Sequence, residues 1–259
     1  MANTYNYITF TLEERVARVT LARPPLNILN IAMMQEINKA LEDCSAERDL
    51  AGIVFAASAD CRAFSAGVSV AEHAPETIFQ MLDSFHAIFR NLEQLGRPSV
   101  AVVNGPALGG GCELITFCDF VIASDQARFG QPEIKLGVFP PVAAILLPRV
   151  IGDRRARELM LTGEIIEAPE ALALGLVNRV VPAAELESET SRLLNTLRGL
   201  SATALEHAKR AIDLGRGRSL DAALKEIEDM YLQELMKTQD AAEGINAFSE
   251  KRKATWQHR

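Results

Sequence analysis

The stretch that decides the fold is Asn104-Gly105-Pro106-Ala107-Leu108-Gly109-Gly110-Gly111-Cys112-Glu113-Leu114, in which three consecutive glycines closely precede a glutamate. It follows an apolar strand expected at 99–103 and leads into an apolar helix. Because glycines have no Cβ, another molecule can approach the main chain, and unpaired N–H groups at a helix start attract negative charge. The pattern predicts an active site that binds a developing oxyanion beside Glu113.

The size and composition of the chain limit its class. It has 259 residues, 48% of them hydrophobic, and a mean hydropathy of +0.06. These values predict one soluble globular unit with an appended subdomain. With 27 basic and 34 acidic residues the net charge is −7, and the one dense basic run is 251–253. Neither a nucleic-acid partner nor an anionic membrane is therefore expected.

Targeting and metal-binding signals are also missing from the sequence. Residues 1–5 lack the features of a secretory signal, and the apolar segment 138–150 is too short and too interrupted by proline to span a bilayer. The histidines show no metal-ligand spacing, so no metal site is expected. A cytoplasmic enzyme with reduced thiols is expected, because no CxxC spacing links the cysteines Cys44, Cys61, Cys112 and Cys118.

Strand-like and helix-like patterns alternate along most of the chain, which predicts α/β units with right-handed crossovers. After a hairpin at 8–21, strands are expected at 52–56, 99–103, 120–123 and 177–181, and helices at 31–41 and 78–92. From about residue 186 only helical patterns remain, at 203–214, 220–235 and 241–253. These last helices are expected to pack on the core or on a neighbouring subunit.

A second segment of small residues is Ala63-Phe64-Ser65-Ala66-Gly67-Val68-Ser69, which follows the strand expected at 52–56. A ligand can reach the main chain of such a segment, so it is a candidate source of a second N–H donor. A tight loop that only packs closely explains the same composition equally well. Ser65 is not expected to be a nucleophile, because it lies outside any GxSxG motif.

A third segment, Phe129-Gly130-Gln131-Pro132-Glu133-Ile134-Lys135-Leu136-Gly137, carries Glu133 on an expected loop. Two carboxylates from separate segments can meet in one pocket, where one accepts a proton from water and the other donates one. Burial of such a pair raises at least one pKa and keeps an acid protonated near neutral pH. Without the glycine segment, a solvated loop or a cap would be the better interpretation of Glu113 or Glu133.

In their order and spacing these three segments resemble the crotonase superfamily of enoyl-CoA hydratases and isomerases. The resemblance covers nearly the whole chain, including 161–164, 168–181 and 248–253. It implies an α/β, crotonase-like core of ββα spiral units over residues 1–195. It also implies a C-terminal helical region, 196–259, that forms trimers, often paired into hexamers. A homotrimer or homohexamer is therefore expected.

The resemblance assigns roles to four residues. The main-chain N–H groups of Val68 and Gly110 would form the oxyanion hole for the thioester carbonyl of an acyl-CoA. Glu113 would activate water, and Glu133 would help to deliver the proton. Since an isomerase of this family works with one carboxylate, the presence of both favours a hydratase. The alternative is a member that keeps both glutamates while another pocket feature changes the reaction.

Coenzyme A enters as part of the substrate, and no separate cofactor is expected. By the resemblance, coenzyme A would lie beside Leu26 and the main chain of Ala66. Its adenine would lie near Phe248 and its phosphates near Lys251 of an adjacent subunit. A core position for Phe248 and an ordinary solvated position for Lys251 are the alternatives. Further substrate contacts are expected at Gly109, Phe139 and Pro141.

The sequence departs from straight-chain hydratases at 138–144, where a glycine-rich stretch is replaced by Val-Phe-Pro-Pro-Val-Ala-Ala. Each proline fixes φ, so this stretch is stiffer. With 64–68 and 85–90 it is most similar to the cyclohexa-1,5-diene-1-carbonyl-CoA hydratases of anaerobic aromatic degradation, although Ser69 replaces the Asp expected there. That similarity implies hydration to 6-hydroxycyclohex-1-ene-1-carbonyl-CoA. A straight-chain enoyl-CoA hydratase of β-oxidation and an enoyl-CoA isomerase are the alternatives.

Two further classes fit the sequence poorly. The glycines at 109–111 match neither GxxxxGK[ST] nor GxGxxG, so a dinucleotide oxidoreductase is not expected. A non-catalytic RNA-binding homologue on the same fold conflicts with the acidic charge and with the presence of both glutamates. His86 is expected to be a partly buried structural residue with a pocket role as the alternative, and Cys112 and Cys118 are expected to be core thiols.

Overall fold

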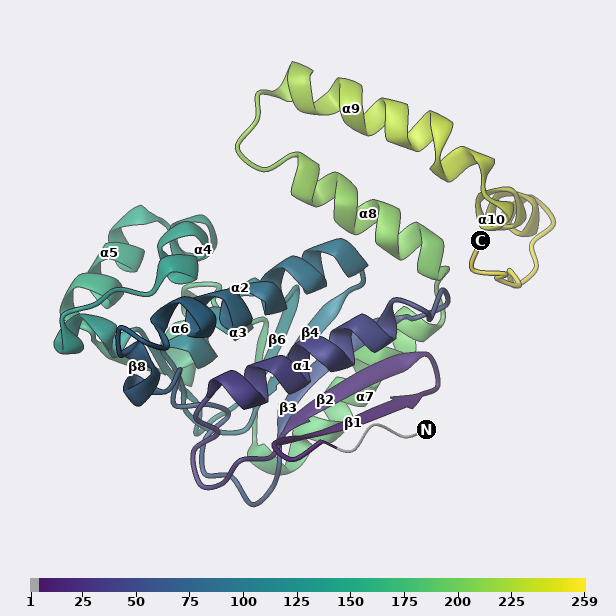
Figure 1. Cartoon of the computed structure of the whole chain (residues 1–259). Coiled ribbons are helices and arrows are strands. Elements are labelled where there is room, and N and C mark those ends of the chain that lie inside the picture. Colours follow the sequence, from purple (N-terminus) through teal and green to yellow (C-terminus); the bar gives the residue numbers. More distant parts are fainter. Residues whose placement is uncertain (1–4) are drawn as a thin grey trace.

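A hairpin begins the main sheet, whose strand order is β1-β2-β3-β4-β6-β9 in a computed structural model that describes residues 5–259 (Figure 1). The hairpin pair β1-β2 is antiparallel and the other pairs are parallel, so the predicted strands and crossover units are confirmed. The strands are β1 Ile8–Glu13, β2 Val16–Leu21, β3 Gly52–Ala57, β4 Ser99–Val103, β6 Phe120–Ser124 and β9 Arg179–Val181.

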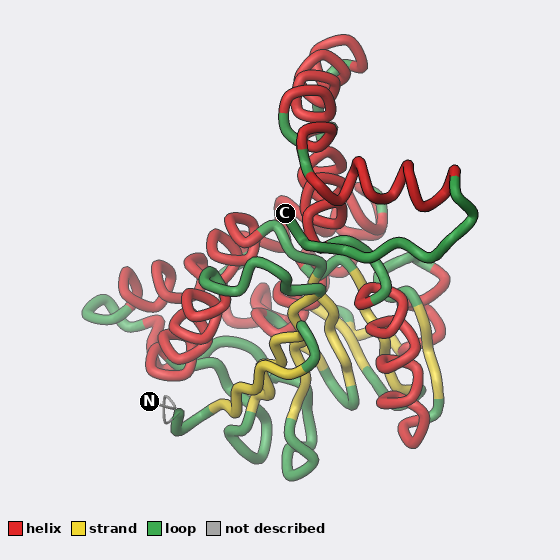
Figure 2. Tube along the Cα trace, turned by 90° about the vertical axis from the view of Figure 1, so that its right-hand side faces the viewer, coloured by secondary structure: helices red, strands yellow, loops and turns green. Residues whose placement is uncertain are grey.

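Helices cover both faces of this sheet (Figure 2). Helices α1 (Ile31–Cys44) and α2 (Ile78–Leu95) lie against one face, and α7 (Leu186–Arg198) lies against the other. Side chains alternate along β3, so Phe55 packs in the core beneath α1 and α2, whereas Val54 packs with Leu186 and Leu194 of α7. Burial on both faces explains why the strands are nearly continuous apolar runs.

A smaller sheet holds the glycine segment in place. It consists of β5 (Ala107–Leu108), β7 (Arg128–Gly130) and β8 (Ile165–Glu167), and the sequence did not predict it. Its strands have only two or three residues, too few to show an alternating pattern. Because β5 ends at Leu108, helix α3 (Gly110–Phe117) begins almost directly from this sheet.

The proline-containing segment after Glu133 is helical. Pro141 lies in the first turn of α4, where its missing N–H removes no intrahelical hydrogen bond. Glu133 lies in a 3-10 helix, which corrects the expectation of a loop. The remaining elements before α7 are η1 Val70–His73, η2 Pro132–Leu136, α4 Pro141–Ile151, α5 Asp153–Thr162, α6 Ala168–Ala173 and η3 Ala183–Glu185.

The C-terminal helices extend away from the sheet (Figure 1). They are α8 Ala202–Leu214, α9 Leu220–Gln233, η4 Leu235–Lys237 and α10 Gln239–Ser249. The tail folds back onto them, since the buried carboxylate of Asp240 accepts hydrogen bonds from Ser201 Oγ and from the main-chain N–H groups of Gln257 and His258. The boundary proposed between residues 195 and 196 falls in the last turn of α7.

A buried ion pair connects α8 to the sheet. Lys209 Nζ donates to both carboxylate oxygens of Asp119, at 2.5 and 2.6 Å, and Asp119 also accepts from the main-chain N–H and hydroxyl of Ser99. The side chains of Lys209 and Asp119 are only 11% and 21% exposed.

Within residues 5–259, no helix combines the length and apolar character needed to cross a membrane.

Removing one member of this pair is expected to destabilise the protein. Asp119→Ala leaves the Lys209 ammonium without its partner in a largely buried position, which lowers the free energy of unfolding by about 3 kcal/mol. The control is Asp83→Ala, which breaks an exposed pair with Arg90 and costs less than about 1 kcal/mol. Urea denaturation of both variants measures the difference, and equal losses would contradict the assignment.

Candidate active site

One apolar cavity of about 370 Å³ brings the three segments singled out in the sequence together. Its walls come from 66–73, from α2, from the start of α3 and from 132–141. Apolar side chains such as Met81, Leu82 and Phe85 form most of its surface. The predicted site residues that line it are Ala66, Val68, Gly109, Glu113, Glu133, Phe139 and Pro141.

Two main-chain N–H groups lie at the junction of the first two segments. Leu29 bonds to the residues on either side of Val68, through Gly67 O and Ser69 N at 2.9 Å each, and leaves the Val68 N–H itself without a partner in the described chain. The N–H of Gly110, at the start of α3, likewise donates to no residue among 5–259. Gly110 adjoins Val68, because a Cβ added there would lie 2.6 Å from Val68 Cγ2.

Ser65 joins these two segments, and Asn27 fixes its hydroxyl; neither role was predicted from the sequence. Ser65 is fully buried, donates its hydroxyl to Asn27 O at 2.7 Å and accepts from the Gly67 N–H at 3.1 Å. Its main chain bonds to Pro106 O and to the Leu108 N–H, at 3.2 and 2.9 Å. In the sequence Ser65 is only a serine among small residues, and this pattern does not show which groups its hydroxyl contacts.

Glu113 is held by the first turn of α4. Its side chain is buried, and Oε1 accepts hydrogen bonds from the N–H groups of Val142 and Ala143 at 2.8 and 2.9 Å. The pKa of Glu113 is raised to about 7. Burial is the main cause, the charge of Glu133 contributes to the rise, and the two N–H donors act in the opposite direction. The carboxyl group therefore changes protonation near neutral pH while its position stays fixed.

Glu133 faces the same cavity from η2. Its pKa is raised mainly by burial, whereas a hydrogen bond from its own main chain and the charge of His73 lower it. A Cβ at Gly109, whose φ is +52°, would collide with the Glu133 carboxylate, so only glycine permits this approach. Buried Gln131 completes the surroundings: with its amide nitrogen turned inward, it donates to Glu133 Oε2 at 3.3 Å and to Gly109 O at 3.2 Å.

Three predicted coenzyme A contacts lie outside the cavity walls. Leu26 is partly exposed beside the cavity, since its carbonyl accepts from the Ala66 N–H at 2.9 Å. Phe248 is 86% exposed, which argues against a core position in a single chain. Phe248 lies near the end of α10 and Lys251 just beyond it, far from α4 in Figure 1. Their placement against coenzyme A of an adjacent subunit stays a prediction.

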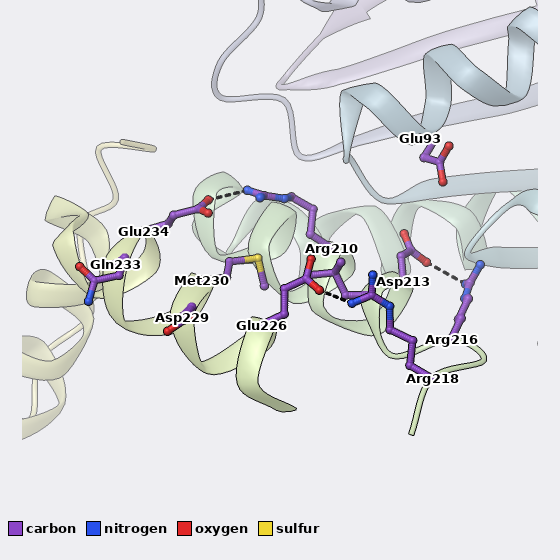
Figure 3. A pocket seen from close by; sticks show the side chains of 11 residues that line it. Glu93, Arg210, Asp213, Arg216, Arg218, Glu226, Asp229, Met230, Gln233 and Glu234 are labelled. Carbon is purple, nitrogen blue, oxygen red and sulfur yellow. Dashed lines mark hydrogen bonds and ion pairs between the residues drawn. The ribbon is translucent and has the colours of Figure 1, made fainter. Parts of the chain in front are cut away.

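A larger cavity, of about 510 Å³, lies between α8 and α9 but is chemically different (Figure 3). Its arginines are already paired with carboxylates, in the pairs Arg210–Glu234, Arg216–Asp213 and Arg218–Glu226. Further acidic residues line the same space, so it presents no free positive charge for an anion.

The cysteines are buried and free. Burial raises the pKa of the Cys112 and Cys118 thiols to about 12, which keeps both protonated and makes them core residues, as expected.

His86 is partly buried and its Nε2 has no hydrogen-bond partner in the described chain. No group of three His, Cys, Asp or Glu side chains within residues 5–259 is arranged to hold a metal ion.

Comparison with known proteins identifies the family. The sequence profile of the family described as "Enoyl-CoA hydratase/isomerase" matches residues 11–259. The chain belongs to the enoyl-CoA hydratase/isomerase family. It is 40% identical to a probable enoyl-CoA hydratase of Mycobacterium bovis, over 99% of this chain and 100% of that protein. It superimposes on a crystal structure of enoyl-CoA hydratase from Bacillus anthracis with a TM-score of 0.91, at 31% identity, covering 98% and 100% of the two chains.

The expected α/β crotonase fold is therefore confirmed, and the protein is an enzyme of the enoyl-CoA hydratase type, a hydro-lyase. The finer similarity to cyclic-diene hydratases has no such support. The cyclohexa-1,5-dienecarbonyl-CoA hydratase of Thauera aromatica is 37% identical, over 93% of each chain, and so does not stand out from the general hydratase of Mycobacterium bovis.

The raised pKa of Glu113 predicts a loss of stability as pH rises. Its pKa is about 7 in the folded chain against 4.5 in a free side chain. The folded state binds more protons between these values, so the free energy of unfolding falls by about 3 kcal/mol across this window. Glu113→Gln removes this titration, and urea denaturation at about pH 4.5 and pH 7.5 should show a correspondingly smaller fall. Equal falls in variant and wild type would contradict the assignment.

Proposed function

We propose that this enzyme hydrates short straight-chain enoyl-CoA thioesters such as crotonyl-CoA. The observation that carries the proposal is the convergence of buried Glu113 and partly buried Glu133 on one apolar cavity beside two unpaired main-chain N–H groups. An apolar cavity suits an unsubstituted acyl chain. The 40% identity to a probable enoyl-CoA hydratase of Mycobacterium bovis supports hydration of an enoyl-CoA thioester.

The unpaired N–H groups of Val68 and Gly110 bind the thioester carbonyl oxygen. Hydrogen bonds to that oxygen draw electron density from the conjugated double bond, so Cβ becomes electrophilic and negative charge collects on the oxygen. Both donors belong to main chain held by the bonds around Ser65 and Leu29. They need no reorganisation as the charge develops, which favours the enolate over the bound substrate.

The two glutamates divide the proton transfers. Glu113, held at Oε1 by Val142 and Ala143, uses Oε2 to accept a proton from water as the water oxygen bonds to Cβ. The double-bond electrons move to the enolate, and protonated Glu133 then donates its proton to Cα. One water is consumed, with its hydroxyl on Cβ, and exchange with solvent restores both protonation states.

Coenzyme A extends from the cavity along Leu26 and Ala66, in this proposal, and reaches Phe248 and Lys251 of an adjacent subunit. The exposed apolar side chains of the C-terminal helices support assembly, because such groups are rarely left in solvent together. They include Ile212, Leu220, Leu224, Tyr231, Leu232, Ile245 and Phe248. The cytoplasmic location expected from the sequence also stays a prediction.

Hydration of cyclohexa-1,5-diene-1-carbonyl-CoA is the second candidate. Phe139 and Pro141 line the cavity, and the consecutive prolines restrict the wall that they form. A rigid wall with an aromatic ring suits a flat cyclic acyl group. The choice is tested by measuring kcat/KM for crotonyl-CoA and the cyclic diene in parallel, following the gain of one water by mass and the change in thioester absorbance. A higher value for the diene would overturn the straight-chain proposal in favour of the cyclic one, and inactivity on both would overturn hydration.

Loss of either carboxylate is expected to abolish most turnover. Glu113→Gln and Glu133→Gln should each lower kcat by about a thousandfold on crotonyl-CoA, since each removes a proton transfer worth roughly a hundred- to ten-thousandfold. The amide keeps the shape of the side chain, so folding should be retained. Glu93→Gln, at the distant cavity beneath α8, is the matched control and should keep full activity. Full activity in either site variant would remove that residue from the mechanism.

The proposed assembly predicts a defined mass in solution. The chain weighs 28.3 kDa, so a homotrimer weighs about 85 kDa and a homohexamer about 170 kDa. Light scattering coupled to size-exclusion chromatography distinguishes these species. A monomer at every concentration tested would contradict both the assembly and the placement of Phe248 and Lys251 at an adjacent subunit's substrate.

A further inference from the structure

One polar side chain in the cavity has no part in the proposed chemistry. Of the residues that line the cavity, only Glu113, Glu133 and His73 carry polar side chains. His73 is the last residue of η1, which begins just after the oxyanion segment at Val68. His73 and Glu133 both line the cavity, so the two side chains face the same space. No ion pair or hydrogen bond joins them in the described chain.

The hydrogen bond to the main chain fixes which nitrogen of His73 carries hydrogen. Nδ1 lies 3.0 Å from Ser69 O. A carbonyl oxygen only accepts, so Nδ1 is the protonated nitrogen of the neutral ring. Nε2, the ring atom farther from the main chain, is then an acceptor with a free lone pair. It makes no hydrogen bond with any residue from 5 to 259, and the ring as a whole is half-buried.

An unpaired acceptor in an apolar cavity discriminates between acyl groups. An unsubstituted chain that fills the cavity takes water away from Nε2 and offers no hydrogen bond in return. A chain that carries a hydroxyl group donates to Nε2 and restores the lost bond. Sites that bond to a substrate hydroxyl reject the analogue that lacks it, because the buried protein group is then left unpaired.

We propose that His73 is a specificity-determining residue of the acyl cavity, whose Nε2 accepts a hydrogen bond from a hydroxyl group carried by the acyl chain. Among enoyl-CoA thioesters of equal chain length, those with a hydroxyl group within reach of Nε2 bind more tightly than the unsubstituted chains, which remain substrates. This inference rests on the proposed function for the identity of the ligand, an acyl-CoA. It assigns His73 to ligand selection and leaves the proton transfers to Glu113 and Glu133.

The test measures binding without turnover. Saturated acyl-CoA thioesters have no double bond to hydrate, so calorimetry gives their dissociation constants directly. Two pairs are compared, butanoyl-CoA with 4-hydroxybutanoyl-CoA and pentanoyl-CoA with 5-hydroxypentanoyl-CoA. Wild type should bind the hydroxylated member of at least one pair about tenfold more tightly, the worth of one buried hydrogen bond. No preference in either pair would overturn the proposal without any variant.

Three variants identify His73 as the source of the preference. His73→Leu should abolish it, and His73→Gln, whose amide oxygen accepts in place of Nε2, should keep it within about threefold. Leu82→Met reshapes the apolar wall and should shift both members of a pair equally. A preference that survives in His73→Leu would overturn the proposal. Crotonyl-CoA hydration by the same wild-type preparation tests the proposed function separately. A binding preference without hydration would overturn the proposed function and leave the role of His73 in place.

Discussion

The close approach of three main-chain segments at Gly109–Gly111 is the constraint on which the rest of the site depends. A Cβ at Gly111 would lie 2.7 Å from Ser65 Cβ and 2.7 Å from Ser65 O, and a Cβ at Gly109 would collide with Glu133. Glycine at these positions lets α3 begin between the loop at 63–69 and η2. Both glutamates then face one cavity, beside the unpaired N–H groups, instead of separate surfaces.

The two carboxyl groups have different supports, which agrees with the separate tasks proposed for them. Glu113 is buried in α3 and held by two N–H donors from the start of α4, whereas Glu133 lies in a short 3-10 helix beside Gln131. Burial raises both pKa values. At Glu113 the N–H groups of other residues oppose this rise, whereas at Glu133 the opposing hydrogen bond comes from its own main chain. Pairs of acids in unequal surroundings are typical of sites in which one group accepts a proton and the other donates one.

The proline-containing segment has a structural consequence beyond the shape of the acyl wall. Pro141 begins α4, so the next two N–H groups, those of Val142 and Ala143, are free to point at Glu113. The same prolines that suggested a cyclic substrate therefore also help to position Glu113, the proposed general base. One local feature thus explains both the stiff wall and the position of the carboxylate. The prolines by themselves are therefore weaker evidence for a cyclic acyl group.

The sequence by itself determined the main-sheet strands, most of the helices, the family and the candidate glutamates, because these depend on local periodicity and on short motifs. Only the tertiary structure decided which groups meet. The short strands β5, β7 and β8 have too few residues for a pattern, and the helical state of 141–151 was hidden by its prolines. His73 had no distinguishing spacing, and its place in the cavity follows from the packing of η1 against α2. Contacts between residues far apart in the chain depend on how the elements pack, and local sequence does not encode that directly.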